Sequence, residues 1–522
     1  MILISSAAYV ISEFQAELGK IPPCFLPLGN KKLLEHQVAV LRKSFPEEII
    51  LISLPESYQL SGSEIRMISE LGVTSVSIPD DFSLAESITY ALNISNTLPA
   101  NHMVRILYGD TLIQDFPHVS ENQDLLGVAR SPDSYDWKIE EDSDEPLVWC
   151  GFYSFTSKPF LLRCLALSRR NFIDAVDLYR KEKPLQIHEF LKWFDLGHVN
   201  TYFRSRASIT TQRAFNELRI EKGVVHKTGL PSLKIQAEGL WFKNIPKPLK
   251  VFIPQLIDQY LDQKQLAHYE LEYLPNMPLN ELFVHGKNTE VEWVRLFTLI
   301  KDFLNKANVS LSESEEKKIE SNFIQLIQEK TFLRLEQYSK DRDFDIYAPI
   351  IYQHIELPSL VEMCKRCVKL VLALPKYPSV LHGDLCFSNI LYDSRAFQVK
   401  VIDPRGINTK NEFTIYGDQK YDLAKLTHSV IGFYDHIIAG RYILNESLDN
   451  GSMDLNFDID DRTLRIQERF KKFEFIRGLT VQQIMPLVIL LFISMLPLHN
   501  DRPDRQKAML ANAARLFKLY IN

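Results

Sequence analysis

The segment LHGDLCFSNILY at residues 381–392, followed by VKVIDPRG at 399–406, decides the fold of the larger part of this chain. Asp384 stands five positions before Asn389, and a second acid, Asp403, follows a short apolar run. Carboxylates are costly to bury unless they are paired or bind a cation. Two acids and an amide this close together therefore indicate a site that handles charge.

The D-x-x-x-x-N spacing of Asp384 and Asn389 is typical of kinase catalytic loops. In such a loop the aspartate orients the attacking hydroxyl and accepts its proton, and the asparagine holds a metal ion. Asp403 follows the predicted strand VKVI, where an acid can chelate a second metal ion. Mg²⁺ is the expected ion, because carboxylate and amide oxygens are hard ligands.

This constellation resembles the aminoglycoside phosphotransferase and choline kinase superfamily, whose fold is that of protein kinases. The motif H-G-D-x-x-x-x-N is matched at His382, Gly383, Asp384 and Asn389, and the second acid is matched by Asp403. The segment GDQKYDLAKL (417–426) is similar to a downstream segment of that family in which Asp422 would be structural. The resemblance implies ATP as phosphoryl donor and a catalytic set of Asp384, His382, Asn389 and Asp403.

A phosphoryl-transfer site also needs a cation on the nucleotide phosphates. The predicted strand VVHKTG offers Lys227, and the following predicted helix offers Glu238 as its partner. The glycine-rich loop is replaced by TTQRAFNEL (210–218), in which Arg213 and Asn216 are candidate phosphate contacts. The segment ELEYLP would be the hinge near the adenine, where Glu272 and Tyr273 supply backbone groups.

The first 200 residues alternate apolar runs with helical patterns, which predicts a mostly parallel sheet. Ligands bind such sheets at the carboxyl ends of the strands. The predicted strand MVRILYGD (103–110) puts Asp110 at that edge.

Four segments of this part resemble sugar nucleotidyltransferases: PPCFLPLGNKKLL (22–34), LYGDTLI (107–113), CGFYSF (150–155) and KWFDLGHVNTY (192–202). The resemblance implies that Asp110 and Asp195 hold Mg²⁺ and that CTP or another nucleoside triphosphate is bound. The chain departs from that family in two places. SSAAYVISEFQAELGKIPP replaces the Gly-rich loop, and Pro23 stands where the signature lysine falls, with Lys20 as a nearby substitute.

The predicted fold class is α/β. It combines an N-terminal Rossmann-like nucleotidyltransferase domain of the GT-A-like kind, residues 1–208, with a C-terminal protein-kinase-like α+β phosphotransferase domain, residues 209–522. Within the second domain we expect an N-lobe at about 209–280 and a helical C-lobe at about 281–522. The acidic stretch 445–461 is predicted to be a surface loop.

Composition limits the classes of partner. The 60 basic and 66 acidic residues give a net charge of −6, which argues against bulk nucleic-acid binding. The apolar segment 484–498 contains two prolines and is predicted to be a buried helix, so no membrane span is expected. Six scattered cysteines and the lack of an export signal favour a cytoplasmic protein with reduced thiols.

Together these features predict a bifunctional enzyme. It would phosphorylate a small hydroxyl compound and then transfer a nucleotidyl group to the product, giving an activated unit for bacterial capsule or lipopolysaccharide synthesis. The acceptor remains open between an amino alcohol, a polyol and a sugar, and an oligomer is compatible with the sequence. Two alternatives are a small-molecule kinase with a non-catalytic first domain and an inactive regulatory protein.

Overall fold

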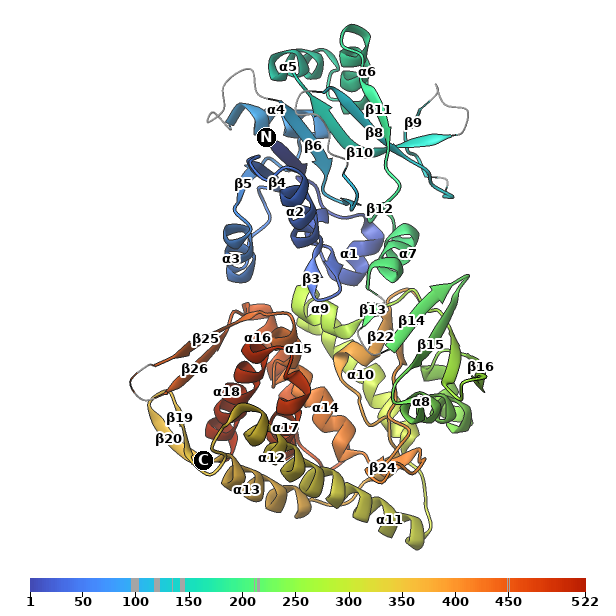
Figure 1. Cartoon of the computed structure of the whole chain (residues 1–522), viewed down its shortest axis with the longest axis vertical. Helices are drawn as coiled ribbons and strands as arrows, with labels where there is room; N and C mark the ends of the chain where they lie inside the picture. The colour runs from blue at the N-terminus through green and yellow to red at the C-terminus, as the bar shows by residue number, and fades with distance from the viewer. Residues whose placement is uncertain are drawn as a thin grey trace. The chain divides into compact units, whose positions relative to one another are not determined.

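The computed structural model describes residues 1–94, 103–116, 123–133, 135–140, 146–210, 212–213, 216–447, 449 and 451–522. The chain forms two compact units (Figure 1). The first unit comprises Met1–Thr210 with His285–Lys287, and the second unit comprises Thr211–Val284 with Asn288–Asn522.

The first unit is built on a mixed sheet with the strand order β11-β8-β10-β6-β1-β4-β5. Its strands are β1 (Ile2–Ser5), β4 (Ile50–Pro55), β5 (Val73–Ile78), β6 (Val104–Tyr108), β8 (Leu125–Ala129), β10 (Leu147–Phe155) and β11 (Gln186–Glu189), with β9 (Ile139–Glu140) beside β10. The strands from β5 to β6 are parallel, as predicted. The second half differs, because β10 runs antiparallel to both β6 and β8. Fully apolar strands such as β10 do not reveal their direction in the sequence.

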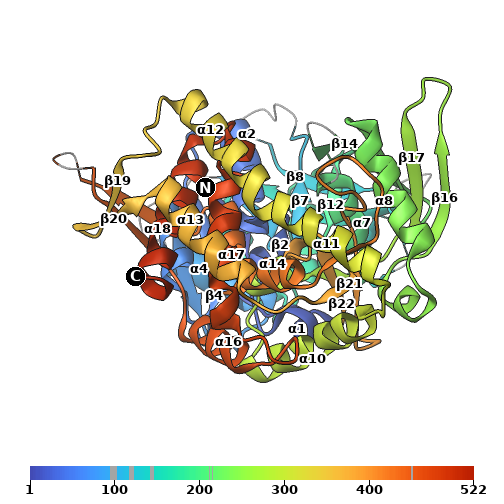
Figure 2. The ribbon, with the colours of Figure 1, turned by 90° about the horizontal axis from the view of Figure 1, so that it is seen from below.

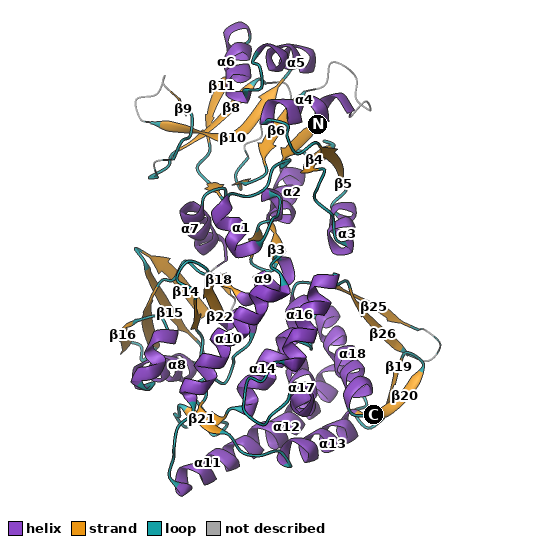
Figure 3. Ribbon diagram, turned by 180° about the vertical axis from the view of Figure 1, so that it is seen from behind, coloured by secondary structure: helices purple, strands orange, loops and turns teal. Residues whose placement is uncertain are grey.

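Helices cover both faces of this sheet (Figure 3). The helices of this unit are α1 (Ser12–Leu18), α2 (Leu33–Ser44), α3 (Gly62–Glu70), α4 (Leu84–Ile94), α5 (Lys158–Leu167), α6 (Phe172–Glu182) and α7 (Val199–Thr210), with a short 3-10 turn at Pro23–Phe25. Separate two-stranded ribbons pair β2 (Pro27–Leu28) with β3 (Lys31–Lys32), and β7 (Thr111–Ile113) with β12 (Trp193–Asp195). Two apolar cores lie on the two faces, one around Ile88 and Tyr153 and the other around Val38 and Phe152.

The second unit begins with an antiparallel sheet of order β13-β14-β15-β17-β16. Its elements are β13 (Gln212–Arg213), β14 (Asn216–Glu221), β15 (Val224–Gly229), α8 (Ser232–Asn244), β16 (Leu256–Leu261) and β17 (Ala267–Glu272). β14 and β15 form a hairpin with a two-residue turn at Lys222 and Gly223. Both turn residues have positive φ, 49° and 80°, as a primed turn requires.

The rest of the second unit is mostly helical. Its helices are α9 (Leu279–His285), α10 (Glu290–Ala307), α11 (Glu313–Ile324), α12 (Lys330–Arg342), α13 (Leu360–Leu372), α14 (Lys420–Val430), α15 (Tyr434–Ile438), α16 (Asp461–Lys472), α17 (Val481–Met495) and α18 (Pro503–Tyr520). A π-helical turn, Gln325–Glu329, joins α11 to α12. In Figure 2 these two helices form one long run that passes α14 and α17. Small antiparallel ribbons carry the quoted motif: β18 (Met277–Pro278), β22 (Ile390–Asp393) and β23 (Gln398–Val401), and β21 (Pro378–Val380) with β24 (Tyr416–Asp418).

The prediction of a surface loop at 445–461 is wrong. β25 (Tyr442–Glu446) and β26 (Met453–Phe457) form a hairpin within a sheet completed by β19 (Pro349–Tyr352) and β20 (Ile355–Ser359). Met453 and Leu455 alternate with polar residues and are buried. The many acidic residues of the segment made this alternation of apolar and polar residues, which is typical of a strand, hard to recognise in the sequence.

The apolar segment near the end is a helix, as predicted. Val481–His499 is the one stretch of the described residues that is long and apolar enough to cross a membrane. Of its apolar window, 78% is buried inside the protein. This helix therefore packs as a core helix does.

Candidate functional site

The catalytic-loop candidates of the second unit lie on a tight turn between β21 and β22. Gly383, with φ of 79°, allows the turn, and a Cβ there would come within 2.8 Å of the side chain of Arg405. Asp422 fixes the turn from α14, because its carboxylate accepts the backbone N–H groups of His382 at 2.9 Å and Gly383 at 2.8 Å. Asp422 thus has the structural place that the sequence predicted for it.

His382 is fully buried, and both ring nitrogens have backbone partners. Nε2 lies 2.9 Å from the carbonyl oxygen of Ile402, and the N–H of Asp384 lies 3.3 Å from Nδ1. Burial lowers the pKa of His382 to about 4. The imidazole is therefore neutral, donates from Nε2 and holds the loop in place.

Asp384 and Asn389 face each other across this loop. The amide nitrogen of Asn389 donates to the backbone oxygen of Asp384 at 2.9 Å and to its Oδ2 at 3.3 Å. This orientation turns the amide oxygen of Asn389 away from Asp384, and the Ser388 hydroxyl lies 3.3 Å from it. Asn389 thus presents an oxygen, the atom that a hard cation prefers.

Lys425 is a residue that the sequence reasoning missed. Its Nζ lies 2.9 Å from Oδ1 of Asp384, and its side chain is 10% exposed. Burial opposes the ionised form of Asp384, but the charge of Lys425, the hydrogen bond from it and the charges of Arg405 and His382 together lower the pKa of the carboxyl. The sequence did contain a signal for this residue. Lys425 stands one helical turn after Asp422 and therefore faces the same catalytic loop.

Lys227, Glu238 and Asp403 come together from three elements. Nζ of Lys227, on β15, lies 2.7 Å from Oε2 of Glu238 on α8 and 3.0 Å from Oδ1 of Asp403. Burial disfavours the charged lysine, but the two carboxylates outweigh it and raise the pKa of Lys227. The hydroxyl of Tyr269 also donates to Glu238, at 2.8 Å. Asp403 has a positive φ of 57°, a backbone strain typical of functional sites.

The remaining nucleotide-site candidates lie at the edges of the first sheet of this unit. Arg213 and Asn216 pair in register on β13 and β14, and their side chains lie outside what the structure describes. Glu272 ends β17 and Tyr273 follows it. Their backbone N–H groups donate within the unit, to Gln255 and Gly223 respectively. These two backbone N–H groups are therefore engaged within the unit.

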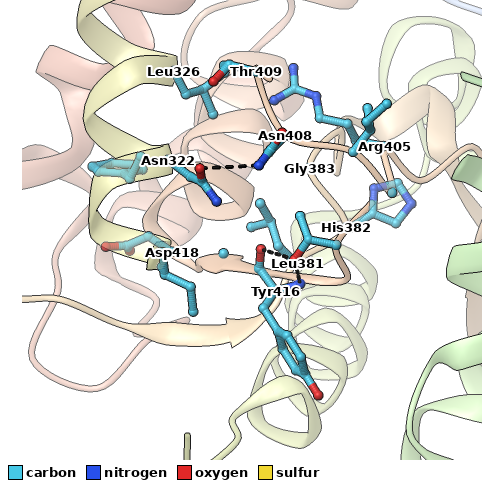
Figure 4. Close-up of a pocket in the computed structure, with 16 residues that line it drawn as sticks. Asn322, Leu326, Leu381, His382, Gly383, Arg405, Asn408, Thr409, Tyr416 and Asp418 are labelled. Carbon is cyan, nitrogen blue, oxygen red and sulfur yellow. Dashed lines mark hydrogen bonds between the residues drawn. The ribbon is translucent and has the colours of Figure 1, made fainter. Parts of the chain in front are cut away.

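A pocket lies beside the catalytic loop, between the end of α11 and the segment that follows Asp403 (Figure 4). Its lining includes His382, Gly383, Arg405 and Asn408. Nδ2 of Asn408 donates to Oδ1 of Asn322 at 3.3 Å, which ties the segment to α11. Arg405 enters from the loop, and its backbone N–H donates to the carbonyl of His382 at 2.8 Å.

In the first unit the structure brings the two predicted acids together. Asp110 follows β6, and the ribbon of β7 with β12 places Asp195 opposite Thr111. The backbone N–H of Leu196 donates to the carbonyl of Asp110 at 2.9 Å. A Cβ at Gly197 would lie 2.5 Å from Oδ2 of Asp110, so a larger residue there would force the carboxylate of Asp110 to move.

Their electrostatic settings differ. Burial, reinforced by the charge of Asp195, raises the pKa of Asp110 to about 6. Asp195 is buried and accepts hydrogen bonds from the Gly197 N–H at 3.3 Å, from His198 Nδ1 at 2.8 Å and from the Thr201 hydroxyl. Asp110 lies next to a second carboxylate and accepts few hydrogen bonds. A bound cation would therefore stabilise its ionised form.

Three further residues complete the account of this site. Pro23 begins a 3-10 turn, and Lys20 is exposed with its Nζ 4.0 Å from the centre of the Tyr9 ring. Gln37, which the sequence reasoning missed, is buried on α2 where apolar residues were expected. Its side-chain nitrogen donates to the carbonyls of Thr111 at 2.7 Å, Tyr108 at 3.2 Å and Gly109 at 3.3 Å, and so holds the backbone around Asp110.

The described residues contain no cluster of three or more His, Cys, Asp or Glu side chains that could hold a metal ion. Mg²⁺ is commonly bound by one or two carboxylates together with substrate phosphates, so it needs no such cluster. Asp403 with the oxygen of Asn389, and Asp110 with Asp195, have the donor chemistry that fits this ion.

No protein-family model matches the sequence, and no curated protein matches it. Solved structures do. A nucleoside-diphosphate-sugar pyrophosphorylase from Vibrio cholerae RC9 is 18% identical, with a TM-score of 0.32, over 40% of this chain and 99% of its own. A choline/ethanolamine kinase family protein from Mesorhizobium loti is 11% identical, with a TM-score of 0.35, over 62% and 96%. A thermostable mutant of an aminoglycoside phosphotransferase is 9% identical, with a TM-score of 0.38, over 60% and 94%. Proteins of both kinds named in the two resemblances are thus present among the solved structures that are similar to this chain. The mixed α/β sheet of the first unit, and the antiparallel sheet followed by helices in the second unit, agree with the predicted α/β fold class.

Proposed function

We propose that this chain is a bifunctional transferase whose second unit is an ATP-dependent small-molecule kinase. The observation that carries the proposal is the convergence of Lys227, Glu238 and Asp403 from three elements, together with Asp384 and Asn389 on the neighbouring loop. These are the parts that phosphoryl transfer requires: a cation for the phosphates, oxygen ligands for a metal and a carboxylate for the hydroxyl.

In the proposed reaction, Asp384 orients the acceptor hydroxyl and takes its proton. The hydroxyl oxygen forms a bond to the γ-phosphorus of ATP, the bond from that phosphorus to the β-phosphate bridging oxygen breaks, and ADP leaves. Lys227 holds the nucleotide phosphates and is itself held by Glu238. Mg²⁺, when bound by Asp403 and Asn389, would neutralise charge on the phosphates. His382 keeps the loop in position and exchanges no proton.

We further propose that the first unit transfers a nucleotidyl group from CTP or another nucleoside triphosphate to the phosphorylated product. A phosphate oxygen of the phosphorylated product would form a bond to the α-phosphorus of the nucleoside triphosphate, the bond from that phosphorus to the oxygen bridging to the β-phosphate would break, and pyrophosphate would leave. Asp110 and Asp195 would hold Mg²⁺, which would neutralise charge on the phosphates. A kinase makes a phosphomonoester and a nucleotidyltransferase consumes one, so the two steps follow each other. We assign the domains as residues 1–208 and 209–522, in a cytoplasmic enzyme that supplies capsule or lipopolysaccharide synthesis.

³¹P NMR of the intact protein tests this proposal, with MgATP, CTP and UTP against pooled hydroxyl compounds. We expect a phosphomonoester signal followed by a pair of diphosphate-diester signals. Asp384→Asn should abolish the first step, and Asp110→Asn only the second. The exposed Asp501→Asn and Asp81→Asn serve as controls. If Asp110→Asn leaves every product unchanged, the first unit is non-catalytic. If no variant alters any signal because ATP is never consumed, the chain is an inactive regulatory protein.

A further inference from the structure

Positively charged side chains from several elements of the second unit act electrostatically on one another, and two of them also act on Asp384. Lys330 and Arg334 stand on α12, Arg405 follows Asp403, and Lys425 stands on α14. The charges of Lys425 and Arg405 both act on the carboxylate of Asp384. This grouping is the basic cluster: Lys330, Arg334, Arg405 and Lys425.

Lys330 is the member whose charge is least compensated. It is partly buried, and the described residues give it no hydrogen-bond or ion-pair partner. Its strongest electrostatic neighbours are all cations, in the order Arg405, Arg334, Lys234 and Lys425. Burial and these charges lower the pKa of Lys330 to about 7. Repulsion between these neighbouring positive charges destabilises the folded state unless a bound anion neutralises them.

The other members have partners that do not neutralise the cluster. Arg334 donates to the carbonyl of Ser494 on α17 at 3.2 Å. Arg405 lies against Tyr421, with Nη2 3.4 Å from its hydroxyl and the guanidinium carbon 5.2 Å from its ring centre. Lys425 alone makes a close ion pair, and its partner is Asp384. Both Asp384 and the loop-binding Asp422 act electrostatically on Arg405, so the uncompensated charge is that of Lys330 and Arg334.

The start of α12 is fixed against the loop that carries Arg405. The π-helical turn Gln325–Glu329 immediately precedes Lys330. Such turns are rare in proteins, and those that occur are often found at functional sites. Oε1 of Gln325 accepts the hydroxyl of Thr409 at 3.1 Å, on the segment that follows Asp403. The extra residue of the π turn rotates α12 relative to α11 by about 100°. The turn therefore sets the face on which Lys330 lies.

We propose that the phosphoryl acceptor carries an oxyanion, a carboxylate or a phosphate, which Lys330, Arg334 and Arg405 hold while its hydroxyl faces Asp384. This inference rests on the proposed kinase function and narrows it. An ammonium-bearing acceptor, such as an amino alcohol, is repelled by the same side chains. Lys227, which is ion-paired with Asp403, supplies the cation that the nucleotide phosphates need.

A matched set of three-carbon acceptors tests the proposal: glycerate and glycerol 3-phosphate as anions, glycerol as the neutral compound, and 3-amino-1,2-propanediol as the cation. ADP release with MgATP is measured for each. We expect kcat/KM to be about 10- to 100-fold higher for one of the anions than for glycerol, since charged hydrogen bonds are strong. The anion with the higher kcat/KM shows whether the site binds a carboxylate or a phosphate. A preference for glycerol or for the cation overturns the proposal.

Variants of α12 locate the effect. Lys330→Met should remove the preference for the anion and leave the KM for ATP unchanged, while Lys330→Arg should retain most of it. Lys340→Met, an exposed lysine on the same helix, is the matched control. If Lys330→Met instead raises the KM for ATP with every acceptor, the cluster holds nucleotide phosphates and the proposal fails.

A second measurement needs no turnover. Lys330 is acetylated with acetic anhydride and quantified by mass spectrometry, with Mg²⁺ and the ATP analogue AMP-PNP at saturation. Glycerate or glycerol 3-phosphate should then protect Lys330, and glycerol should not. Complete protection by the nucleotide alone, or none by either anion, overturns the proposal. If the anions protect Lys330 but ATP is neither bound nor consumed, the anion site stands and the kinase function is the part that fails.

Discussion

Lys425 on α14 lies with its Nζ 2.9 Å from Oδ1 of Asp384, so the proposed catalytic base is ion-paired with a buried lysine. Burial alone would favour the neutral acid, and Lys425, together with Arg405 and His382, reverses that preference. Because the base must be ionised to accept a proton, this pair helps to set the lowest pH at which the proposed kinase reaction can run.

Replacing Lys425 by methionine should move the acidic limb of the pH–rate profile upward. Without the lysine, burial acts on Asp384 with only Arg405 and His382 left to oppose it, so the pKa of the carboxyl rises. The fraction of ionised base at a given acidic pH then falls, so kcat should drop more at low pH than at neutral pH. The measurement is kcat between pH 4 and 9. Lys425→Arg, which keeps the charge, should restore most of the profile, and an unshifted limb in Lys425→Met would show that the lysine does not control Asp384.

Lys227 should be important for stability as well as for ATP. Lys227→Met leaves the carboxylates of Glu238 and Asp403 next to each other without a cation. Breaking a buried pair costs about 3–5 kcal/mol, and less here because Asp403 is 35% exposed. Urea denaturation of the second unit measures the loss, and nucleotide titration should show ATP binding weakened by at least about tenfold.

The double variant Lys227→Met with Glu238→Gln is the control for that prediction. Removing the charge of Glu238 should recover part of the lost free energy of unfolding, because one unpaired carboxylate disappears with it. ATP binding should stay weak. Strictly additive losses of stability would contradict the coupling between the two residues.

Much of the fold was predictable from sequence, because periodicity and turn residues are local signals. The hairpin at Lys222 and Gly223 and the helix at Val481–Met495 follow from such signals. Local signals do not predict the direction of β10 or the hairpin at 442–457, because strand pairing depends on partners that are distant in the sequence.

The candidate site divides in the same way. Motif spacing picked out Asp384, Asn389 and Asp403 because they lie within one short stretch. Gln37 acts across the fold on residues distant in sequence, and no spacing rule links it to the acids, so its role is visible only when the helices are packed. For Lys425 the sequence signal is its helical spacing from Asp422, and the ion pair with Asp384 itself is formed across the fold.

The ionised carboxylate of Asp110 should lower the folding stability of the metal-free protein at neutral pH. Its pKa in the folded state is about 6, above the ordinary value of 3.8, so the folded protein holds the proton more tightly than the unfolded chain does. Folding stability from this group is therefore complete below pH 4 and is lost as the pH rises through 6. The loss amounts to at most about 3 kcal/mol.

In EDTA, Asp110→Asn should raise the melting temperature of the first unit at pH 7.5 and leave it nearly unchanged at pH 4. Calorimetry at both values measures this. Asp81→Asn, at an exposed position, should have no effect at either pH. A lower melting temperature for Asp110→Asn at pH 7.5 would mean that the ionised carboxylate stabilises the unit.

Gln37→Leu should loosen the backbone that carries Asp110. The substitution keeps the volume of the side chain but removes the donor shared by the carbonyls of Tyr108, Gly109 and Thr111. Leaving buried carbonyls without a donor costs about 1–3 kcal/mol, which urea denaturation of the first unit should show. Because Asp110 lies between two of these carbonyls, the proposed nucleotidyl transfer should fall while ATP-dependent phosphorylation is unchanged. Gln59→Leu, at an exposed position, is the control. Full stability and full nucleotidyl transfer in Gln37→Leu would show that the ribbon of β7 and β12 positions Asp110 without help from α2.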